Sequence, residues 1–334
     1  MALPELAFAD LGEDPAPTVA RLPAAAGVGQ LLGPGGQSLL LAPTSNLRRW
    51  AAARLGLGGP PKPGRRPPTS LRGVASAVAW ARTAAPFEQR LLYERRMAAL
   101  VPTAARRDLK PPAFLHLDPA ERFPRLSVRS AAAEPQGLFG PFRSRRAAET
   151  AREALHRRFP LRPCDYTFEP DPALPLGLGC LFAQVRSCAA PCLMRTSEED
   201  YRALAARAAA YLGDPDARVQ GADTIAAPVA AIDQSRALVV DPGRSEIGLY
   251  PVRAGRVLEH AAVVAPAATL AEAVARLDWP DGEGADDWAW LSAWIHGPKG
   301  RRSFLPVPDP ADRADLLRRV WAALPPRLAT AHER

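Results

Sequence analysis

The sequence predicts an α/β protein of the α+β kind: a small sheet with flanking helices, then a cysteine-rich middle segment, then a C-terminal α+β domain. Short apolar runs bounded by glycine- and proline-rich turns indicate strands. Amphipathic stretches opened by capping residues indicate helices. Three of the four cysteines lie between residues 180 and 192. The chain has 334 residues, which is enough for two or three domains.

The sequence of the N-terminal part predicts a β-hairpin followed by helices. Residues 1–20 are expected to form a weakly ordered lead-in to a first domain over residues 21–105. Residues 27–32 and 37–42 are typical of two strands joined by the turn-forming residues 33–36. Asn46 is expected to cap a short basic helix. A glycine-, proline- and arginine-rich loop should follow over residues 56–69.

A longer helix is expected after Pro86, whose fixed φ angle suits a first helical turn. Four residues then share one helical face, namely Phe87, Leu91, Glu94 and Ala98. A carboxylate therefore lies on an otherwise apolar packing face.

The middle segment, residues 106–213, should contain two capped helices around cysteine-rich loops. Ser144 is expected to cap the first helix, and the capping-box sequence that begins at Ser197 should open the second. In the C-terminal domain, residues 214–334, a meander of strands is expected over 237–240, 246–252 and 257–264. Helical stretches rich in tryptophan follow, and Trp288, Trp294 and Trp321 are expected in the core because tryptophan buries a large apolar area.

The charge of the chain favours an anionic partner, although basicity also serves solubility. The net charge is +8, and of 43 basic residues only Lys62, Lys110 and Lys299 are lysines. Arginine suits forked phosphate contacts, but a GC-rich genome also raises arginine content. No apolar run approaches the roughly 20 residues of a membrane-spanning helix, and acidic residues occupy the N-terminus where a signal peptide would be basic. A cytoplasmic protein without a membrane partner is expected.

Several collinear blocks of the sequence match the motifs of one known family. Residues 22–50, LPAAAGVGQLLGPGGQSLLLAPTSNLRRW, are similar to that family's opening pattern LP-xxP-GVY-(ten residues)-YVG-KAxNLRxR. Later blocks match at FPRLSVR (123–129), GLFGPFRSRRAAETAREALHRRFPLRPC (137–164) and CLFAQVRSCAAPCLMRTSEEDY (180–201). On these blocks the chain resembles UvrC, the GIY-YIG endonuclease of bacterial nucleotide excision repair, and its short homologue Cho. The resemblance implies a GIY-YIG-like first domain and a function in nucleotide excision repair or a related DNA transaction.

The residues that this family uses to cut DNA are largely replaced. Gly29 and Leu40 stand at the two tyrosine positions, Pro43 at the lysine position and Trp50 at the final arginine position. None of these side chains transfers a proton to or from a phosphate oxygen. The resemblance therefore implies a DNA-binding protein that has lost nuclease activity. Two alternatives stay open: an active endonuclease that uses relocated residues such as Glu94, Arg48 and Tyr93, and a structural partner of a repair complex.

Glu94 matches the metal-binding glutamate of the family, which implies a possible Mg²⁺ or Mn²⁺ site. A single carboxylate is a weak site, because magnesium usually draws on further carboxylates or on substrate phosphates. The alternative is a polar helix residue paired to an arginine such as Arg90.

The four cysteines form the second candidate site. Cys164, Cys180, Cys188 and Cys192 are four soft donors from loop segments, which suit zinc or an iron–sulfur cluster. The family has cysteines at matching positions, and the resemblance implies a four-iron cluster there. Zinc and unliganded thiols stay open as alternatives.

Clustered arginines are the candidate DNA-binding residues, since contacts to phosphates position DNA without reading its sequence. They are Arg48, Arg49, Arg65, Arg66, Arg106, Arg107, Arg143, Arg145, Arg146, Arg157 and Arg158. UvrB binding is not expected, because Asp214-Pro215-Asp216 follows where the family's UVR helix pair would begin. The RNase H-like nuclease and the helix-hairpin-helix domain of UvrC are also expected to be absent, as in Cho.

Overall fold

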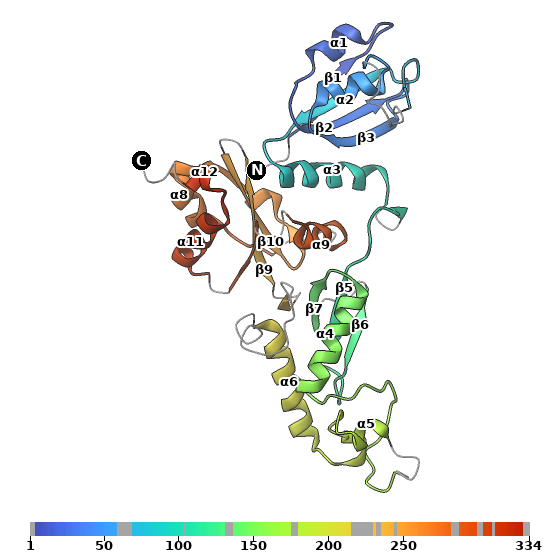
Figure 1. The fold of residues 1–334 in the computed structure, drawn as a ribbon, viewed down its shortest axis with the longest axis vertical. Coiled ribbons are helices and arrows are strands. Elements are labelled where there is room, and N and C mark those ends of the chain that lie inside the picture. Colours follow the sequence, from blue (N-terminus) through green and yellow to red (C-terminus); the bar gives the residue numbers. More distant parts are fainter. Residues whose placement is uncertain are drawn as a thin grey trace.

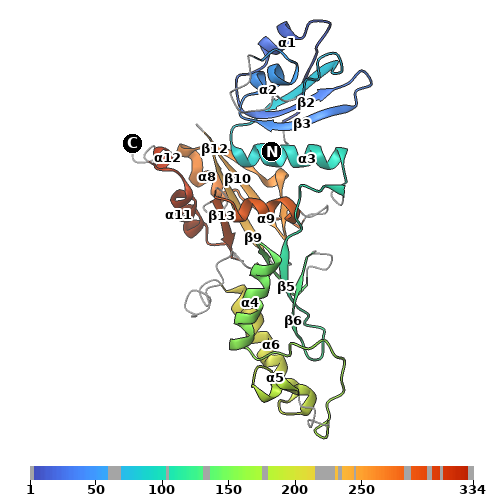
Figure 2. The same cartoon turned by 45° about the vertical axis from the view of Figure 1, so that its right-hand side comes forward.

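The computed structural model describes residues 4–58, 69–102, 105–130, 136–174, 180–214, 230–231, 235–243, 246–281, 287–298, 303–308 and 311–329. Three antiparallel sheets with flanking helices give the α+β fold that the sequence predicts. The chain is elongated, with the N-terminal sheet at one end, the cysteine-rich loops at the other and the C-terminal sheet between them (Figures 1 and 2). Within the described residues, no helix is both long and apolar enough to cross a membrane.

The N-terminal sheet has the strand order β1-β4-β2-β3. The predicted hairpin is confirmed as β2 (Gly27–Leu32) and β3 (Ser38–Thr44). Helix α2 (Leu47–Arg54) follows, and the Asn46 side chain accepts a hydrogen bond from the Arg49 amide at 2.8 Å, which confirms the predicted cap. Strand β4 (Ala77–Arg82) then pairs with β2 and leads into α3 (Pro86–Leu100).

The start of the chain differs from the expected lead-in. Strand β1 (Ala7–Asp10) pairs with β4, and helix α1 (Ala16–Arg21) packs beside α2. Leu11, Val19 and Leu22 are buried in the core of the first domain. Burial of these apolar side chains orders the segment. The sequence did not predict this, because the apolar residues of the segment show no clear helical or strand periodicity.

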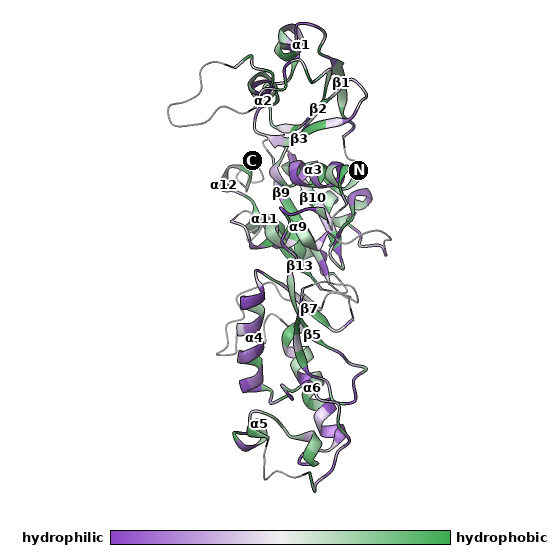
Figure 3. Cartoon of the chain, turned by 90° about the vertical axis from the view of Figure 1, so that its right-hand side faces the viewer, coloured by the Kyte–Doolittle hydropathy of each residue, from purple (hydrophilic) through white to green (hydrophobic). Residues whose placement is uncertain are grey.

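The middle domain is built on β5 (Ala113–Leu117), β6 (Leu126–Arg129) and β7 (Leu138–Phe142), with the two-residue strand β8 (Ala230–Ala231) at its edge. Helices α4 (Arg145–Arg158) and α6 (Glu198–Gly213) cover it, and Ser144 and Ser197 cap them as predicted. The face of α4 that points away from the sheet is strongly hydrophilic (Figure 3). Along the chain, the short helices α5 (Leu181–Gln184) and η3 (Pro191–Leu193) come between α4 and α6.

The C-terminal sheet has the order β11-β10-β9-β13, with β12 also paired to β10. Its strands are β9 (Arg236–Pro242), β10 (Glu246–Arg253), β11 (Arg256–Val257), β12 (Val263–Pro266) and β13 (Phe304–Val307). Its helices are η4 (Glu259–Ala261), η5 (Ala267–Thr269), α8 (Leu270–Ala275), α9 (Trp288–His296), α11 (Arg313–Ala323) and α12 (Pro326–Ala329). As expected, these tryptophans lie in or against cores: Trp288 is buried and Trp294 packs against the same cluster, while Trp321 packs against a second cluster formed by β9, β10, α8 and α11.

Helix α3 connects the N-terminal sheet to the C-terminal domain. On one side, Leu92 packs with Val28 and Ala81 of the N-terminal sheet. On the other side, Phe87 and Leu91 share a buried core with residues of β9, β10 and α9. The predicted packing face of α3 is therefore confirmed. The elements on which it packs lie about 150 residues later in the chain: Phe87 and Asp241 of β9, for example, are 154 residues apart.

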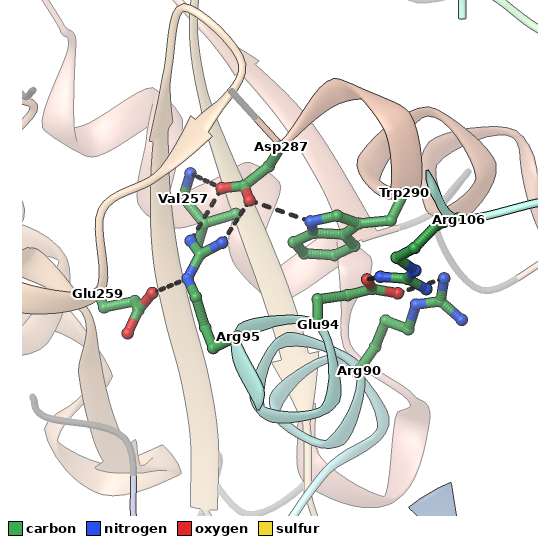
Figure 4. Close-up of polar contacts among 8 residues, drawn as sticks. All are labelled: Arg90, Glu94, Arg95, Arg106, Val257, Glu259, Asp287 and Trp290. Atoms are coloured by element: carbon green, nitrogen blue, oxygen red, sulfur yellow. Dashed lines mark hydrogen bonds and ion pairs between the residues drawn. The ribbon is translucent and has the colours of Figure 1, made fainter. Parts of the chain in front are cut away.

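Two polar contacts fix this junction. Asp241 on β9 accepts hydrogen bonds from the backbone amides of Phe87 and Glu88 at 2.8 and 2.9 Å, so it caps the first turn of α3. Arg95 binds the Asp287 carboxylate with both terminal nitrogens and Glu259 with Nε (Figure 4). Because α3 shares its core with the last third of the chain, it is as much a part of the C-terminal domain as of the first.

Candidate nucleic-acid interface and cysteine centre

The positions that correspond to the GIY-YIG tyrosines and arginine form an apolar contact. Leu40 and Trp50 pack against the same core of the first domain. A Cβ atom placed on Gly29 would lie 2.4 Å from Cζ3 of Trp50, so the indole ring fills the space that any larger side chain at Gly29 would need. Pro43 lies exposed on β3. This face of the sheet carries no proton-transfer group at the replaced positions.

Glu94 is buried between two arginines. Its Oε1 pairs with Arg90 at 2.5 Å, its Oε2 pairs with Arg106, and its side chain is 3% exposed (Figure 4). The pairing with Arg90 is the alternative raised from the sequence. Glu94 also shares the helical face of Phe87 and Leu91, which points away from the N-terminal sheet.

Gln89 is the polar residue of α3 that faces the N-terminal sheet, and the sequence analysis did not single it out. Its Nε2 donates to the carbonyl oxygens of Gly27 and Thr44 at 2.7 and 2.8 Å. Gln89 lies three residues before Leu92, so the two share the side of α3 that faces the sheet. This spacing could have identified Gln89 from the sequence. Gln89 therefore ties α3 to the sheet by two hydrogen bonds, and Glu94 does not.

The arginines predicted to contact DNA are distributed along the length of the molecule. Arg48 and Arg49 are exposed on α2, and Arg48 Nε also donates to the Leu22 carbonyl at 2.8 Å. Arg65 and Arg66 lie outside the described residues. Arg107 is exposed.

Arg106 differs from the expectation of a phosphate-binding residue. Its side chain is 3% exposed, and it pairs with Glu94 and Asp108. The hydrogen bond from Arg106 holds the pKa of the Asp108 carboxyl below its usual value. A guanidinium that is buried between two carboxylates is not presented to a phosphate, so Arg106 is removed from the candidate interface.

A compact group of cations lies at the start of α4. Arg143, Arg145 and Arg146 are all exposed there, and Arg145 pairs with Glu149 at 2.9 Å. Arg157 and Arg158 are exposed at the other end of the same helix. The first turn of α4 also presents the free backbone N–H groups of a helix N-terminus beside the first three of these cations.

The four cysteines meet in the loops at the far end of the molecule. Cys180 precedes α5, Cys192 lies in η3, and both pack against the small core of Ala183, Ala190 and Leu193. Burial, with smaller contributions from the sulfurs of Cys164, Cys180 and Cys192, raises the pKa of the Cys188 thiol to about 11. The pKa of Cys192 is raised by burial and by Cys180 and Cys164. The sulfurs of Cys164 and Cys180 thus lie close enough to contribute to the raised pKa values of Cys188 and Cys192.

The backbone of these loops is strained. Arg186, Ala190 and Met194 have φ angles of 56°, 53° and 52°, in the left-handed region that non-glycine residues rarely adopt. Such conformations cost on the order of 1–3 kcal/mol each, and they persist where the surroundings hold them. The Ala190 amide donates to Cys188 Sγ at 3.3 Å, which fixes one of these residues to a sulfur.

Arg162 positions the first cysteine, a role that the sequence analysis missed. Its side chain donates to the backbone oxygens of Phe123, Cys164 and Tyr166 at 2.7, 3.2 and 2.9 Å. The buried Tyr201 hydroxyl accepts from the Arg162 amide at 2.8 Å and donates to Pro124. An arginine two residues before Cys164 in the FPLRPC block was the available signal.

The donor set fits a soft metal in its chemistry, because all four donors are thiols: Cys188 is buried, and Cys164, Cys180 and Cys192 are part-buried. Nevertheless, the described part of the chain contains no group of three or more His, Cys, Asp or Glu side chains arranged to hold a metal ion. The thiols are near one another without forming a coordination shell.

The comparisons identify the domain that carries these cysteines. Residues 113–211 match the family described as UvrC/Cho excinuclease, middle domain. Through this domain the chain is UvrC-like. The matched region of the UvrC-like chain runs from β5 into α6, and it includes all four cysteines and the cations of α4.

The UvrC-like chain is similar to several proteins named UvrABC system protein C. That of Novosphingobium aromaticivorans is 37% identical over 115 residues, covering 34% of this chain and 17% of the relative. That of Geotalea daltonii is 38% identical over 107 residues, covering 32% and 17%. That of Renibacterium salmoninarum is 32% identical over 170 residues, covering 49% and 26%. The aligned regions thus span about a sixth to a quarter of these relatives. No solved structure matches the chain.

Proposed function

We propose that this UvrC-like chain binds DNA in nucleotide excision repair or a related DNA transaction, without cutting DNA by the GIY-YIG mechanism. The relatives are named as components of the UvrABC system, and the matched domain is named for an excinuclease. The observation that carries the proposal is the exposed cluster of Arg143, Arg145 and Arg146 inside that domain. Arginines at a helix N-terminus bind phosphates through forked, charge-assisted hydrogen bonds.

Loss of the α4 cations is expected to weaken DNA binding and its salt dependence. Each phosphate contact removed lowers the slope of log affinity against log salt by about 0.9. The triple variant Arg143→Ala, Arg145→Ala, Arg146→Ala should therefore reduce the slope by about 2 to 3, the lower figure applying if the Glu149 pairing already diverts Arg145. Fluorescence anisotropy of a labelled duplex between low and moderate salt measures both quantities.

A charge-matched control separates a DNA-binding site from a general effect of net charge. Arg21, Arg276 and Arg318 are exposed arginines elsewhere in the chain. Replacing all three by alanine removes the same charge and should leave the slope nearly unchanged. If both triple variants bind DNA as the parent does, the α4 cations are not the DNA-binding site. If the parent itself does not bind DNA, the chain is instead the structural partner of a repair complex.

Two contacts support the loss of GIY-YIG chemistry. Trp50 packs on Gly29 where the family would place an arginine and a tyrosine. Glu94 is paired to Arg90 and Arg106, so the relocated-site alternative would require its carboxylate to leave two buried ion pairs.

We also propose that Cys164, Cys180, Cys188 and Cys192 hold an iron–sulfur cluster, with zinc as the alternative. A bound metal would favour the thiolate form of Cys188, whose pKa is raised chiefly by burial and to a smaller extent by the neighbouring sulfurs. It would also offset the strain of the left-handed residues Arg186, Ala190 and Met194.

Protein purified without oxygen is expected to be brown and to contain iron and acid-labile sulfide. Cys188→Ala and Cys192→Ala should each lose most of the iron and destabilise the middle domain, because metal binding and ordering of the loops are coupled. Ser187→Ala, beside Cys188, is the control and should retain the colour. Colourless protein with about one zinc per chain would replace the cluster with a zinc site. Folded, metal-free protein would exclude both.

A further inference from the structure

A cavity of about 350 Å³ lies where the three parts of the chain meet. Arg90 of α3, residues 108–112, Arg143 before α4 and one face of α9 line it. Its size falls in the range of small-molecule pockets, which begins at about 300 Å³. Neither the cysteine loops nor the replaced GIY-YIG positions contribute to this cavity.

The lining is positively charged. Arg90, Lys110 and Arg143 face it, and Asp108 is the one carboxylate in the lining. Asp108 is already paired with Arg106 at 2.6 Å. Lys110 and Arg143 are exposed and have no ion-pair or hydrogen-bond partner among the residues that the structure describes. Two cations are therefore available to an anion in this pocket.

The rest of the lining is mostly apolar. Leu109, Pro111 and Pro112 form the apolar wall before β5, and Ala289 and Ala293 form the apolar wall from α9. Ser292, a residue that is 6% exposed, and His296 are the polar residues that α9 contributes. An inorganic ion would leave these walls unused. An organic anion whose charged group meets Lys110 and Arg143 would cover them.

We propose that this cavity binds a phosphomonoester of about mononucleotide size. Phosphate is the group that best matches a lysine and an arginine, through a point charge and a forked pair of hydrogen bonds. The nucleoside body lies against the proline and alanine walls. The phosphomonoester comes either from a free nucleotide or from the 5′ end of a DNA strand.

The test compares ligands with and without the phosphate by calorimetry on the full chain. Thymidine 5′-monophosphate and a 5′-phosphorylated oligonucleotide of a few nucleotides are set beside thymidine and the 5′-hydroxyl oligonucleotide. At least one phosphorylated ligand should bind at least tenfold more tightly than its unphosphorylated counterpart. A preference confined to the oligonucleotide pair assigns the site to a DNA end, and one seen with the mononucleotide assigns it to a free nucleotide. No binding, or equal binding within both pairs, would overturn the proposal.

Two variants locate the binding in this cavity. Lys110→Ala removes a lining cation, and Ala293→Glu adds a carboxylate from an exposed position on α9. Each variant should lower the affinity for the phosphorylated ligand at least tenfold. Arg107→Ala removes an exposed cation that does not line the cavity and should change binding less than twofold, on the order expected for a distant screened charge. Unchanged binding in both lining variants would place the ligand elsewhere. The cavity shares Arg143 with the α4 cations, and neither variant replaces Arg143, Arg145 or Arg146, so duplex binding by α4 can be measured separately in both variants.

Discussion

Replacing Asp287 by alanine is expected to lower the free energy of unfolding by about 3–5 kcal/mol. The Asp287 carboxylate is buried and receives hydrogen bonds from Arg95, from the Val257 amide at 2.9 Å and from Trp290 Nε1 at 3.0 Å. Its removal leaves two buried N–H donors without an acceptor and leaves the Arg95 guanidinium with Glu259 as its remaining carboxylate partner (Figure 4). We expect a value at the lower end of this range, because the Arg95 side chain is 32% exposed and water can solvate its guanidinium once Asp287 is removed.

Urea unfolding followed by tryptophan fluorescence measures this loss, since Trp288, Trp290 and Trp294 all lie near the junction. Asp315→Ala is the control, because Asp315 pairs with Arg318, whose side chain is 76% exposed. That substitution should cost less than about 1 kcal/mol. A double-mutant cycle between Arg95 and Asp287 isolates the ion pair itself. Equal losses for Asp287→Ala and the control would mean that this contact does not hold α3 to the C-terminal domain.

The chain is expected to show no DNA cleavage with Mg²⁺ or Mn²⁺ above background. Loss of one positioned proton-transfer group costs on the order of 10²–10⁴ in rate, and the resemblance to UvrC places Gly29 and Leu40 at both tyrosine positions. It places Pro43 and Trp50 at the positions of two cations. These losses do not add simply, because such groups act as a unit, but none of the four replacing side chains supplies a proton-transfer group or a charge.

Incubation with supercoiled plasmid and with damaged or branched duplex tests this prediction, beside Glu94→Ala. Cleavage that disappears in the Glu94 variant would overturn it and support a relocated active site. Cleavage by both proteins would indicate a contaminating nuclease. Because Glu94 pairs with Arg90 and Arg106, the variant's fold must be checked by its unfolding curve before the comparison is made.

Reintroducing one tyrosine alone should not restore activity. A side chain at Gly29 meets the Trp50 ring at 2.4 Å from its Cβ, so Gly29→Tyr requires Trp50 to move. The two replacements form one packed contact.

Local features of this protein were determined by the sequence itself. The β2–β3 hairpin, the caps at Asn46, Ser144 and Ser197, and the apolar face of α3 all formed as expected. Each depends on residues only a few positions apart, so a turn-forming run, a capping side chain or a helical period suffices to specify it. The order of the cysteines along the chain likewise indicated that they belong to one segment.

The tertiary structure decided which surfaces meet. A helical period shows that Phe87, Leu91 and Glu94 share a face, but not that the face packs on β9 and α9. The same holds for Arg106, which the sequence analysis grouped with Arg107 as a candidate DNA-binding residue and whose guanidinium is buried and paired with Glu94 and Asp108. Residues 7–22 likewise form regular structure because they pack on a core to which α2 and β4 contribute. Packing partners are chosen by complementary apolar areas and charges that come together only when distant segments fold, and no local pattern records them.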